Sequence, residues 1–259
     1  MGRRSFDAAA YEAAELLRLA AGKPNKHYTT AIIAAAGSST RMGDGVSKQQ
    51  LEIDGIPVLA RTLLAYEQAL TVQEIILTAR REEFEPFRAL AEAYKITKLK
   101  RITEGGATRQ ESVRHGLDVV SKKTKFVAIA DGARCLITPE QIDRVNLTAY
   151  RTDAASAAVP ATDTVKIVDT HNRTVASPDR KTVWLAQTPQ TFALPLYRAA
   201  AYYAKEKGVE ATDDNSLVEA IGRQVTLVDC GKENIKITTP TDLYLAHAIL
   251  TSRKKEEQQ

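Results

Sequence analysis

Few cysteines, no long apolar run and no strong excess of one charge are the first features of this sequence. Cys135 and Cys230 are the only two cysteines, and they lie far apart, so neither a disulfide framework nor a zinc cluster is indicated. No apolar run approaches the ~18 residues of a membrane span. The formal net charge of +4 is too small to indicate nucleic-acid binding, although it suits small anionic substrates.

Histidine is also scarce, and its four copies have no spacing typical of a metal site. They are His27, His115, His171 and His247. We expect each of them to be structural or solvent-exposed. A reaction that depends on a Ser-His or Cys-His pair is therefore not indicated, whereas a nucleophile that is already ionised, such as a phosphate oxygen, needs no such pair.

We expect no secretory signal at the N-terminus, because charged side chains interrupt the apolar residues of an amphipathic helix expected over residues 5–21. The expected apolar face of this helix consists of Phe6, Ala10, Ala13, Leu17 and Ala20. We expect a cytoplasmic protein that binds neither membranes nor nucleic acid. No linker rich in Gly, Ser or Pro divides the chain. The expected parts are a helical extension over residues 1–28, one domain over 29–251 and a charged tail over 252–259.

An apolar run followed by a loop of small residues occupies residues 31–48. The run has the length of a buried strand, and such a strand places loop N–H groups at the sheet edge where α/β proteins bind ligands. Gly37 has no Cβ, so the main chain there permits close approach of a ligand. Arg41 and Lys48 supply the charge that a polyphosphate needs. These residues predict a nucleoside triphosphate site, and the alternative is an ordinary solvated loop.

Spacing excludes two common phosphate loops at this place. Met42 stands where a P-loop has its second glycine, and no Gly-Lys pair follows. The pattern Gly-x-Gly-x-x-Gly fails as well, because its last position after Gly43 and Gly45 is Lys48.

Apolar strands and amphipathic helices alternate over the first half of the chain, which predicts a parallel sheet with right-handed crossovers. Further strands are expected at 74–79, 100–103, 126–130, 155–160, 184–187 and 225–228. A second glycine-rich loop with Gly105, Gly106 and Arg109 leads into a helix that carries Ser112, and the start of a helix suits an anion or a base edge. The alternative for Ser112 is a helix cap or support.

Acidic and basic residues follow the strand expected at 126–130. Asp131 and Arg134 are either site residues at a strand end or an ordinary surface ion pair. Thr138-Pro139-Glu140-Gln141 has the pattern of a capping box and predicts the start of a helix.

Two short strands around the turn at 169–172 predict a hairpin arm over about residues 160–186. The arm carries Lys166 and Arg180, which form either a site or the polar face of the hairpin. A two-stranded ribbon is marginally stable alone, so a second copy of the chain is the simplest cover. We therefore expect a homodimer through the arm.

Eight motifs together carry a resemblance to a known family. They are Ala-Ala-Gly-x-x-x-Arg-Met at 35–42, Lys48-Gln49, Gly-Gly-x-x-Arg-x-x-Ser at 105–112, Asp-Gly-Ala-Arg at 131–134, Val-Pro-Ala-Thr-Asp-Thr-Val-Lys at 159–166, Gln-Thr-Pro-Gln at 187–190, Thr-Asp-Asp-Asn-Ser at 212–216 and Asn-Ile-Lys at 234–236. In this order they resemble the 2-C-methyl-D-erythritol 4-phosphate cytidylyltransferases over nearly the whole chain after residue 29. The chain departs from the family pattern at Ser47, where Pro is usual, at Gln50, where an aromatic residue is usual, and at Cys135, where Pro is common.

The resemblance implies an α/β fold, namely a single Rossmann-like nucleotidyltransferase domain with a mostly parallel central sheet and a projecting β-hairpin arm. It also implies CTP and a polyol phosphate as substrates, with Mg²⁺ on the triphosphate and Asp131 as a candidate protein ligand. The implied catalytic residues are Arg41, Lys48 and Lys236. The implied nucleotide-binding residues are Ala35, Ala36, Gly37, Ser38, Gly105, Gly106, Arg109 and Ser112. The implied residues for the polyol phosphate are Asp131, Arg134, Thr164, Arg180 and Thr188, and part of the set that holds the 4-phosphate is expected to come from the arm of the partner subunit.

Two alternatives remain open at the level of sequence. A related transferase makes CDP-ribitol from ribitol 5-phosphate and shares fold, loop and arm. Asp-Gly-Ala-Arg at 131–134 and Asn-Ile-Lys at 234–236 favour the methylerythritol phosphate enzyme over it. A non-catalytic nucleotide-binding protein of the same fold is the other alternative, and the presence of Arg41, Lys48 and Lys236 argues against it.

Overall fold

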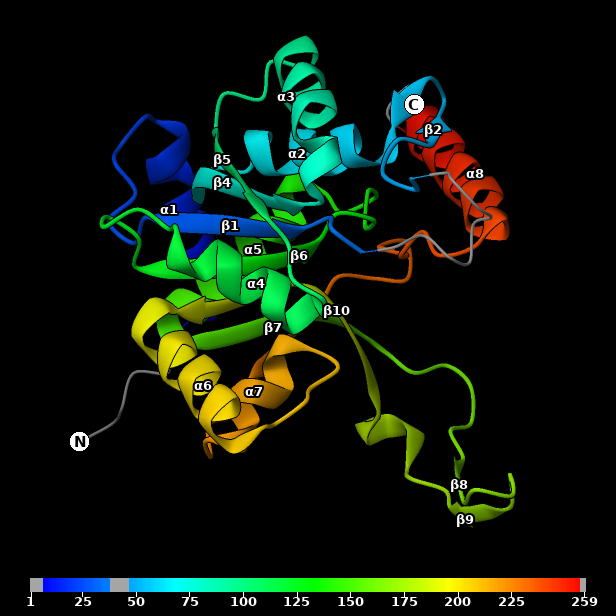
Figure 1. Ribbon diagram of the computed structural model, residues 1–259. Helices are drawn as coiled ribbons and strands as arrows, with labels where there is room; N and C mark the ends of the chain where they lie inside the picture. Colours follow the sequence, from blue (N-terminus) through cyan, green and yellow to red (C-terminus); the bar gives the residue numbers. More distant parts are fainter. Residues whose placement is uncertain (1–6, 38–46, 257–259) are drawn as a thin grey trace, which may run out of the picture.

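A seven-stranded sheet forms the centre of the computed structural model, which describes residues 7–37 and 47–256 (Figure 1). The strand order is β11-β7-β10-β6-β1-β4-β5. The strands are β1 (Thr29–Ala34), β4 (Val72–Ala79), β5 (Leu99–Glu104), β6 (Phe126–Asp131), β7 (Ala154–Pro160), β10 (Trp184–Ala193) and β11 (Thr226–Asp229). Strand β10 is antiparallel to β6 and β7, and the other pairings of these strands are parallel. The predicted α/β fold with a mostly parallel sheet is confirmed.

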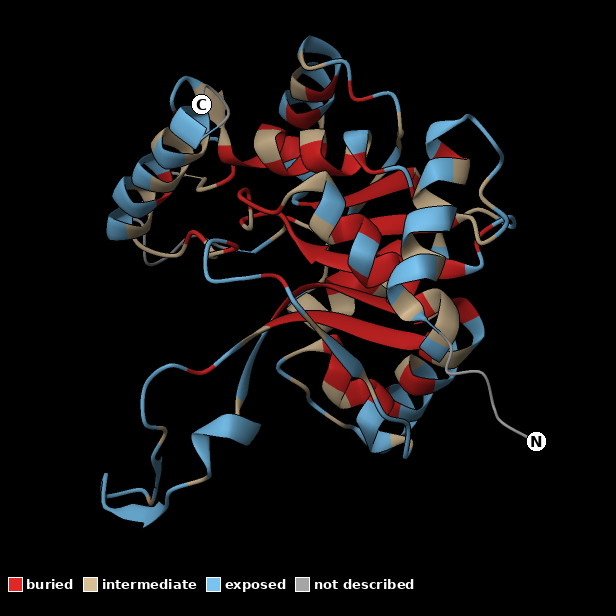
Figure 2. Ribbon diagram, turned by 180° about the vertical axis from the view of Figure 1, so that it is seen from behind, coloured by how far each residue is buried: buried red, intermediate tan, exposed pale blue. Residues whose placement is uncertain are grey.

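Helices cover both faces of this sheet. The helices of the described residues are α1 (Ala8–Ala20), α2 (Val58–Gln68), α3 (Phe84–Ala93), α4 (Arg109–Asp118), α5 (Pro139–Thr152), α6 (Leu194–Lys207), α7 (Asp214–Ala220) and α8 (Pro240–Glu256), with short 3₁₀ helices η2 (Arg81–Glu83) and η3 (Arg180–Thr182). Leu63 and Phe87 from α2 and α3 pack on one face, and Val113 and Tyr197 from α4 and α6 pack on the other. Figure 2 shows the buried strands between these two layers.

Two hairpins lie outside the sheet. Strands β2 (Glu52–Ile53) and β3 (Ile56–Pro57) pair beside α8, at the turn that Asp54 and Gly55 predict. Strands β8 (Ile167–Val168) and β9 (Thr174–Ala176) form the predicted arm, which projects from the body in Figure 1. The arm therefore leaves the sheet where β7 ends and returns where β10 begins.

Strand β10 is longer than the sequence analysis predicted. The sequence analysis expected a strand over residues 184–187 only. The strand instead continues to Ala193, and the pairing with β7 shifts register between Ala186 and Gln190, so that Pro189 falls within the irregularity. A cis peptide bond joins Thr188 to Pro189.

The predicted apolar face of the N-terminal helix is wrong. Helix α1 begins after Asp7, whose carboxylate accepts from two backbone N–H groups of the first turn. Leu17 on the predicted face is 73% exposed, whereas Leu19 is buried. An ion pair of 2.9 Å between Glu12 and Arg151 joins α1 to α5. Alanines lie all around this helix, so the apolar pattern did not specify one face.

The predicted charged tail is largely helical. Helix α8 continues to Glu256, and Arg253 lies within it. The Arg253 guanidinium donates to Oε2 of Glu233 at 2.8 Å and to the carbonyl of Leu136 at 2.9 Å. At the start of α8, Oδ2 of Asp242 accepts from the backbone N–H groups of Thr238 and Thr239.

Candidate active site

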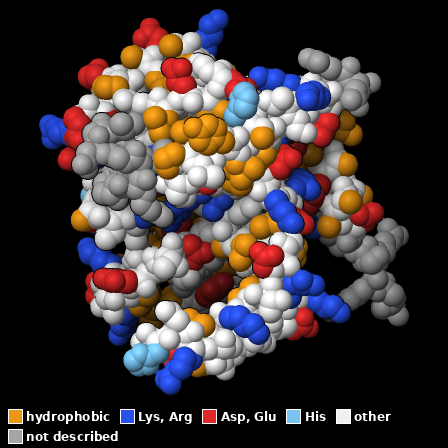
Figure 3. All heavy atoms as spheres, turned by 90° about the vertical axis from the view of Figure 1, so that its right-hand side faces the viewer, with side chains coloured by type: hydrophobic (Ala, Val, Ile, Leu, Met, Phe, Trp, Pro, Cys, Tyr) orange, Lys and Arg blue, Asp and Glu red, His pale blue; other side chains and the backbone are white. Residues whose placement is uncertain are grey.

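A cleft of about 490 Å³ lies at the carboxyl ends of β1, β4, β5 and β6. Among the described residues, its lining consists of Ala34, Ala36, Gly37, Lys48, Gln49, Arg80, Gly106, Ala107, Thr108, Arg109, Ser112, Asp131, Ala133 and Lys236. Figure 3 faces this side of the molecule and shows a hollow with Lys and Arg side chains gathered beside it. Four of the lining side chains are cationic and one is a carboxylate, so the cleft suits a polyanion.

The first nucleotide loop enters the cleft at the end of β1. Ala36 and Gly37 line the cleft, and Lys48 lines it at the other end of the loop. Ala35 is buried, and its N–H donates to the carbonyl of Thr78 at 2.8 Å, which fixes the loop start beside β4. The predicted Ser38 and Arg41 lie outside the described residues, so their roles stay predictions.

The second glycine-rich loop packs tightly against the first. A Cβ on Gly105 would lie 2.2 Å from Cβ of Ala36, so a larger residue there would push the two loops apart. Thr108 caps α4, because its hydroxyl accepts from the N–H of Glu111 at 3.0 Å. Gly106 and Arg109 line the cleft next to this helix start.

Ser112 supports the second loop from within α4. Its buried hydroxyl donates to the carbonyl of Thr108 at 2.9 Å and accepts from the N–H of Gly106 at 2.9 Å. The expected alternative of a supporting role is therefore present in the structure. Ser112 lines the cleft, and its contact with a cytosine stays a prediction.

Asp131 is the centre of a buried charge cluster rather than one half of a surface pair. Its side chain accepts from Nε of Arg109 at 2.9 Å and pairs with Nζ of Lys236 at 2.9 Å. Nε of Arg134 lies 3.6 Å from the same carboxylate. Burial favours the protonated form, but Arg109 and Lys236 outweigh it and hold the pKa of the Asp131 carboxyl well below its usual range.

A second carboxylate fixes the other end of Arg109. Nη1 of Arg109 donates to Asp214 at 2.7 Å, and the hydroxyl of Tyr197 donates to the same carboxylate at 2.6 Å. Burial lowers the pKa of Arg109, but Asp214 and Asp131 raise it above the ordinary value, so the guanidinium stays charged. Burial and Asp214 raise the pKa of Tyr197 well above its usual value, so Tyr197 remains a donor. The arginine is thus held rigidly between two acids.

Lys236 reaches the cleft from the segment before α8. Ile237 is buried, and its N–H donates to the carbonyl of Ala133 at 2.8 Å, so this segment lies along the chain that follows β6. Nη1 of Arg134 donates to the carbonyl of Asn234 at 2.7 Å. These contacts hold Lys236 beside Asp131.

The residues predicted for the polyol phosphate lie in three places. Asp131 lines the cleft, and the Thr188 hydroxyl accepts from its backbone N–H at 3.1 Å. Arg134 lines a smaller cavity of about 330 Å³ at the base of the arm. Thr164 and Arg180 lie on the arm and line neither cavity, and Arg180 donates to the carbonyl of Thr162 at 2.9 Å. One chain therefore does not bring this predicted set together.

The sequence analysis missed several residues of the site, among them Gln49, Arg80 and Asp214. Arg80 and Gln49 line the cleft, and Asp214 holds Arg109 from outside it. Arg80 directly follows a buried strand, so the strand-end rule could have found it. Asp214 lies in the motif at 212–216, but a carboxylate that acts through an arginine far away in sequence leaves no local signal.

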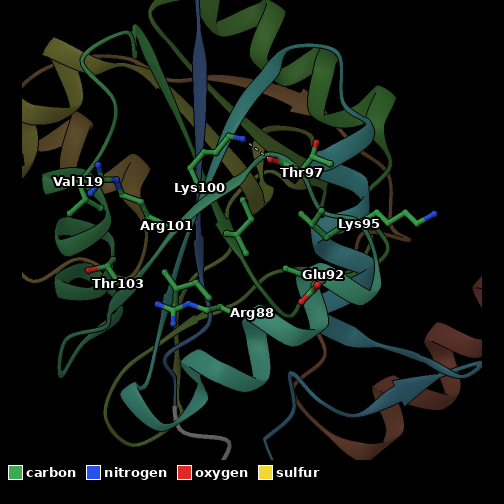
Figure 4. Close-up of a pocket in the computed structure, with 12 residues that line it drawn as sticks. Arg88, Glu92, Lys95, Thr97, Lys100, Arg101, Thr103 and Val119 are labelled. Carbon is green, nitrogen blue, oxygen red and sulfur yellow. Dashed lines mark hydrogen bonds between the residues drawn. The ribbon is translucent and has the colours of Figure 1, made fainter.

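A larger cavity of about 740 Å³ lies elsewhere, along the edge strand β5 (Figure 4). Its labelled residues include Arg88, Lys95, Lys100 and Arg101, and neither glycine loop contributes to it. Charged side chains on an edge strand are a common protection against pairing with another sheet. The smaller cleft at the strand ends is the better candidate, because the motif residues meet there.

The sequence and the fold match one family. The family model of 2-C-methyl-D-erythritol 4-phosphate cytidylyltransferase (IspD) matches residues 29–252. The enzyme of that name from Syntrophus aciditrophicus is 43% identical over 233 residues, with 90% of this chain and 98% of the relative covered. The one from Desulforamulus reducens is 42% identical over 224 residues, with 86% and 96% covered.

Solved structures show the same likeness. The 4-diphosphocytidyl-2C-methyl-D-erythritol synthase of Anaerococcus prevotii superposes with a TM-score of 0.79 at 29% identity, covering 87% of this chain and 97% of that one. The cytidylyltransferase of Thermus thermophilus has a TM-score of 0.71 at 33% identity, with coverage of 86% and 98%. No helix in the described ranges is both long and apolar enough to cross a membrane. The chain belongs to the 2-C-methyl-D-erythritol 4-phosphate cytidylyltransferase family, a family of nucleotidyltransferases.

Proposed function

We propose that this enzyme transfers CMP from CTP to 2-C-methyl-D-erythritol 4-phosphate. An oxygen of the 4-phosphate attacks the α-phosphorus of CTP, the bond from that phosphorus to the bridging oxygen breaks, and pyrophosphate leaves with the bond electrons. The observation that carries the proposal is the meeting of Lys48, Lys236 and both glycine loops in one cationic cleft of a chain that belongs to this family.

The cations of the cleft supply electrostatic stabilisation. Lys48 and Lys236, together with the predicted Arg41, neutralise charge that develops around the α-phosphorus. Asp131 holds Lys236 at 2.9 Å, so this ammonium is in place before the substrate arrives. Positioning and charge neutralisation suffice here, because the attacking phosphate oxygen is already ionised.

The two glycine loops are proposed to hold the nucleotide. Ala35, Ala36 and Gly37 would present main chain to the phosphates, and Gly106 and Ser112 would read the cytosine edge. The hydrogen bond from the N–H of Gly106 to the Ser112 hydroxyl favours a fixed conformation of this second loop. Arg109 lines the cleft, and its ion pairs with Asp131 and Asp214 fix its orientation.

Mg²⁺ is the proposed cofactor. Among the described residues, no group of three or more acidic, His or Cys side chains could hold a metal ion, and Asp131 is the one carboxylate in the cleft lining. This donor set fits an ion that takes most of its ligands from phosphate and water, as Mg²⁺ does. Such an ion would neutralise phosphate charge, with Asp131 as the protein oxygen available to it.

A homodimer through the arm is proposed as the assembly. The arm exposes the apolar side chains of Ile167 and Val175, and Leu185 is exposed near its base. Val175 is 63% exposed. A two-stranded ribbon with such a surface favours burial against a partner. In this assembly Thr164 and Arg180 would reach the 4-phosphate bound by the other subunit. We also propose a cytoplasmic location.

The substrate assignment is tested with purified protein, CTP and Mg²⁺. Each polyol phosphate is added in turn, and pyrophosphate release is measured. We expect release with 2-C-methyl-D-erythritol 4-phosphate and little release with ribitol 5-phosphate. Preference for ribitol 5-phosphate would replace the acceptor, and CTP binding without release from either would indicate a non-catalytic protein.

A further inference from the structure

One arginine without an assigned role lines the nucleotide cleft. Arg80 directly follows β4 and is one of the four cations in the described lining. We propose that Arg80 is an additional binding residue for the β- and γ-phosphates of the nucleotide, and that Glu83 and Ser47 position it. The inference rests on the proposed function and adds a phosphate-binding group to the same site.

One carboxylate joins Arg80 to the nucleotide loop. Oε1 of Glu83 accepts from Nη2 of Arg80 at 2.7 Å and from Oγ of Ser47 at 2.8 Å. The Glu83 side chain is only 6% exposed, so these donors compensate a buried charge. Ser47 immediately precedes Lys48, which also lines the cleft. The same oxygen therefore couples the positions of two cations.

A helix cap alone does not account for these contacts. Oε2 of Glu83 accepts from the backbone N–H of Arg80 at 3.3 Å, which satisfies the start of η2. That contact needs only a backbone N–H, so most residues at position 80 would make it. The guanidinium and the Ser47 hydroxyl use the other oxygen, Oε1, and neither is needed for the cap.

The departure from the family pattern at Ser47 acquires a physical reason. Proline, which is usual there, restrains the backbone but has no hydroxyl to donate. In this chain Ser47 donates to Glu83 instead, so a hydrogen bond takes over the restraint of the residue before Lys48. The serine and Arg80 thus act through one shared acceptor.

The guanidinium of Arg80 suits phosphate oxygens. It presents five donors in a planar fork, and it contacts Oε1 of Glu83 and, at 3.4 Å, the exposed carboxylate of Glu82. Strand β4 is the neighbour of β1, whose loop the phosphates are proposed to follow. A cation directly after β4 therefore lies next to the strand end at which this loop begins, and Lys48 lines the same cleft.

Direct titration without an acceptor tests the inference. The Kd values of CTP, in the presence of Mg²⁺, and of cytidine are measured for wild type, Arg80→Gln and Arg80→Lys. We expect Arg80→Gln to raise the Kd of CTP roughly tenfold, the scale of one charge-assisted contact, and to leave the Kd of cytidine unchanged. Arg80→Lys should retain part of the CTP affinity, because it keeps the charge and loses the fork.

Arg81→Gln is the matched control. Arg81 is the next residue, its side chain is 83% exposed, and it does not line the cleft. This variant should bind CTP as wild type does. An unchanged Kd for CTP in Arg80→Gln, or an equal loss for CTP and cytidine, would overturn the phosphate contact.

A double-mutant cycle tests the positioning by Ser47. Ser47→Ala alone should raise the Kd of CTP by a few-fold. In the Arg80→Gln background it should raise this Kd little further, because both changes act through Glu83. Fully additive losses would contradict this coupling. The titration contains no acceptor, so it measures CTP binding independently of CMP transfer. If Arg80 contributes to CTP binding but the transfer assay gives no product, the proposed function fails and the role of Arg80 in binding stands.

Discussion

Nζ of Lys236 lies 2.9 Å from Oδ2 of Asp131, and this ion pair joins the segment before α8 to the carboxyl end of β6. Asp131 is only 7% exposed and is also bound by Arg109, so the ammonium is held by a rigid partner. A preorganised cation needs no reorganisation when charge develops on a phosphate. The pair therefore connects the architecture of two distant segments to the proposed reaction.

The first prediction concerns the two lysines of the cleft. Lys48→Ala and Lys236→Ala should each lower kcat roughly 10²-fold or more, the scale for removing one preorganised electrostatic donor. Lys122→Ala, at an exposed loop residue, is the control and should behave as wild type. Steady-state kinetics with CTP measures the effect. A near-normal kcat with only a raised KM for CTP would show that the lysine binds the ground state alone.

The second prediction concerns acid stability. Arg109 and Lys236 hold the pKa of the folded Asp131 carboxyl below the ordinary aspartate value of 3.8, which applies in the unfolded chain. Its contribution to stability is therefore complete above pH 3.8 and is lost as the pH falls below that value towards the folded pKa. Wild type should therefore lose Tm more steeply than Asp131→Asn between about pH 4 and 2. Thermal unfolding at a series of pH values measures both slopes. Parallel curves for the two proteins would contradict the depressed pKa.

The third prediction separates two glycines of the facing loops. Gly105→Ala should cost about 1–3 kcal/mol of unfolding free energy, because its Cβ would meet Cβ of Ala36 at 2.2 Å. Gly37→Ala should leave stability nearly unchanged, since no described atom lies within 4 Å of its added Cβ, but it should weaken CTP binding. Denaturant unfolding and CTP titration of both variants measure this. Equal destabilisation of the two variants would refute the tight packing of the loops.

The fourth prediction tests an active site shared between two chains. Lys48→Ala and Arg180→Ala chains, each expected to be nearly inactive, are unfolded together and refolded as a mixture. Under random pairing, half of the dimers are mixed and each contains one intact site, so about a quarter of the wild-type activity should return. Refolding each variant alone is the control. Mixed dimers without activity would mean that Arg180 acts in its own chain or has no role.

Local pattern was sufficient for much of the fold and for part of the site. Apolar runs at 74–79 and 126–130 became buried neighbours of β1, and Thr138 formed the predicted capping box with Gln141. Parallel strands share one carboxyl edge, so loops that follow them meet there. That rule placed Gly37, Gly106 and Asp131 in one cleft.

Long-range contacts account for what the sequence did not predict. The continuation of β10 past Pro189 depends on pairing with β6 and β7, which is not visible in a local window. Asp214 gains its role from Arg109, and Glu83 gains its role from Ser47. The face of α1 depends on where Arg151 of α5 lies. Each of these relationships exists only after the chain has folded.

The most direct measurement of the central claim is a competition between the two acceptors in one mixture. The enzyme, CTP and Mg²⁺ are incubated with equal concentrations of 2-C-methyl-D-erythritol 4-phosphate and ribitol 5-phosphate, and the nucleotide products are identified by mass. We expect CDP-methylerythritol as the main product, formed in equal amount to pyrophosphate, and we expect Lys48→Ala to form little of it. CDP-ribitol as the main product, or no cytidine diphosphate product from either acceptor, would contradict the central claim.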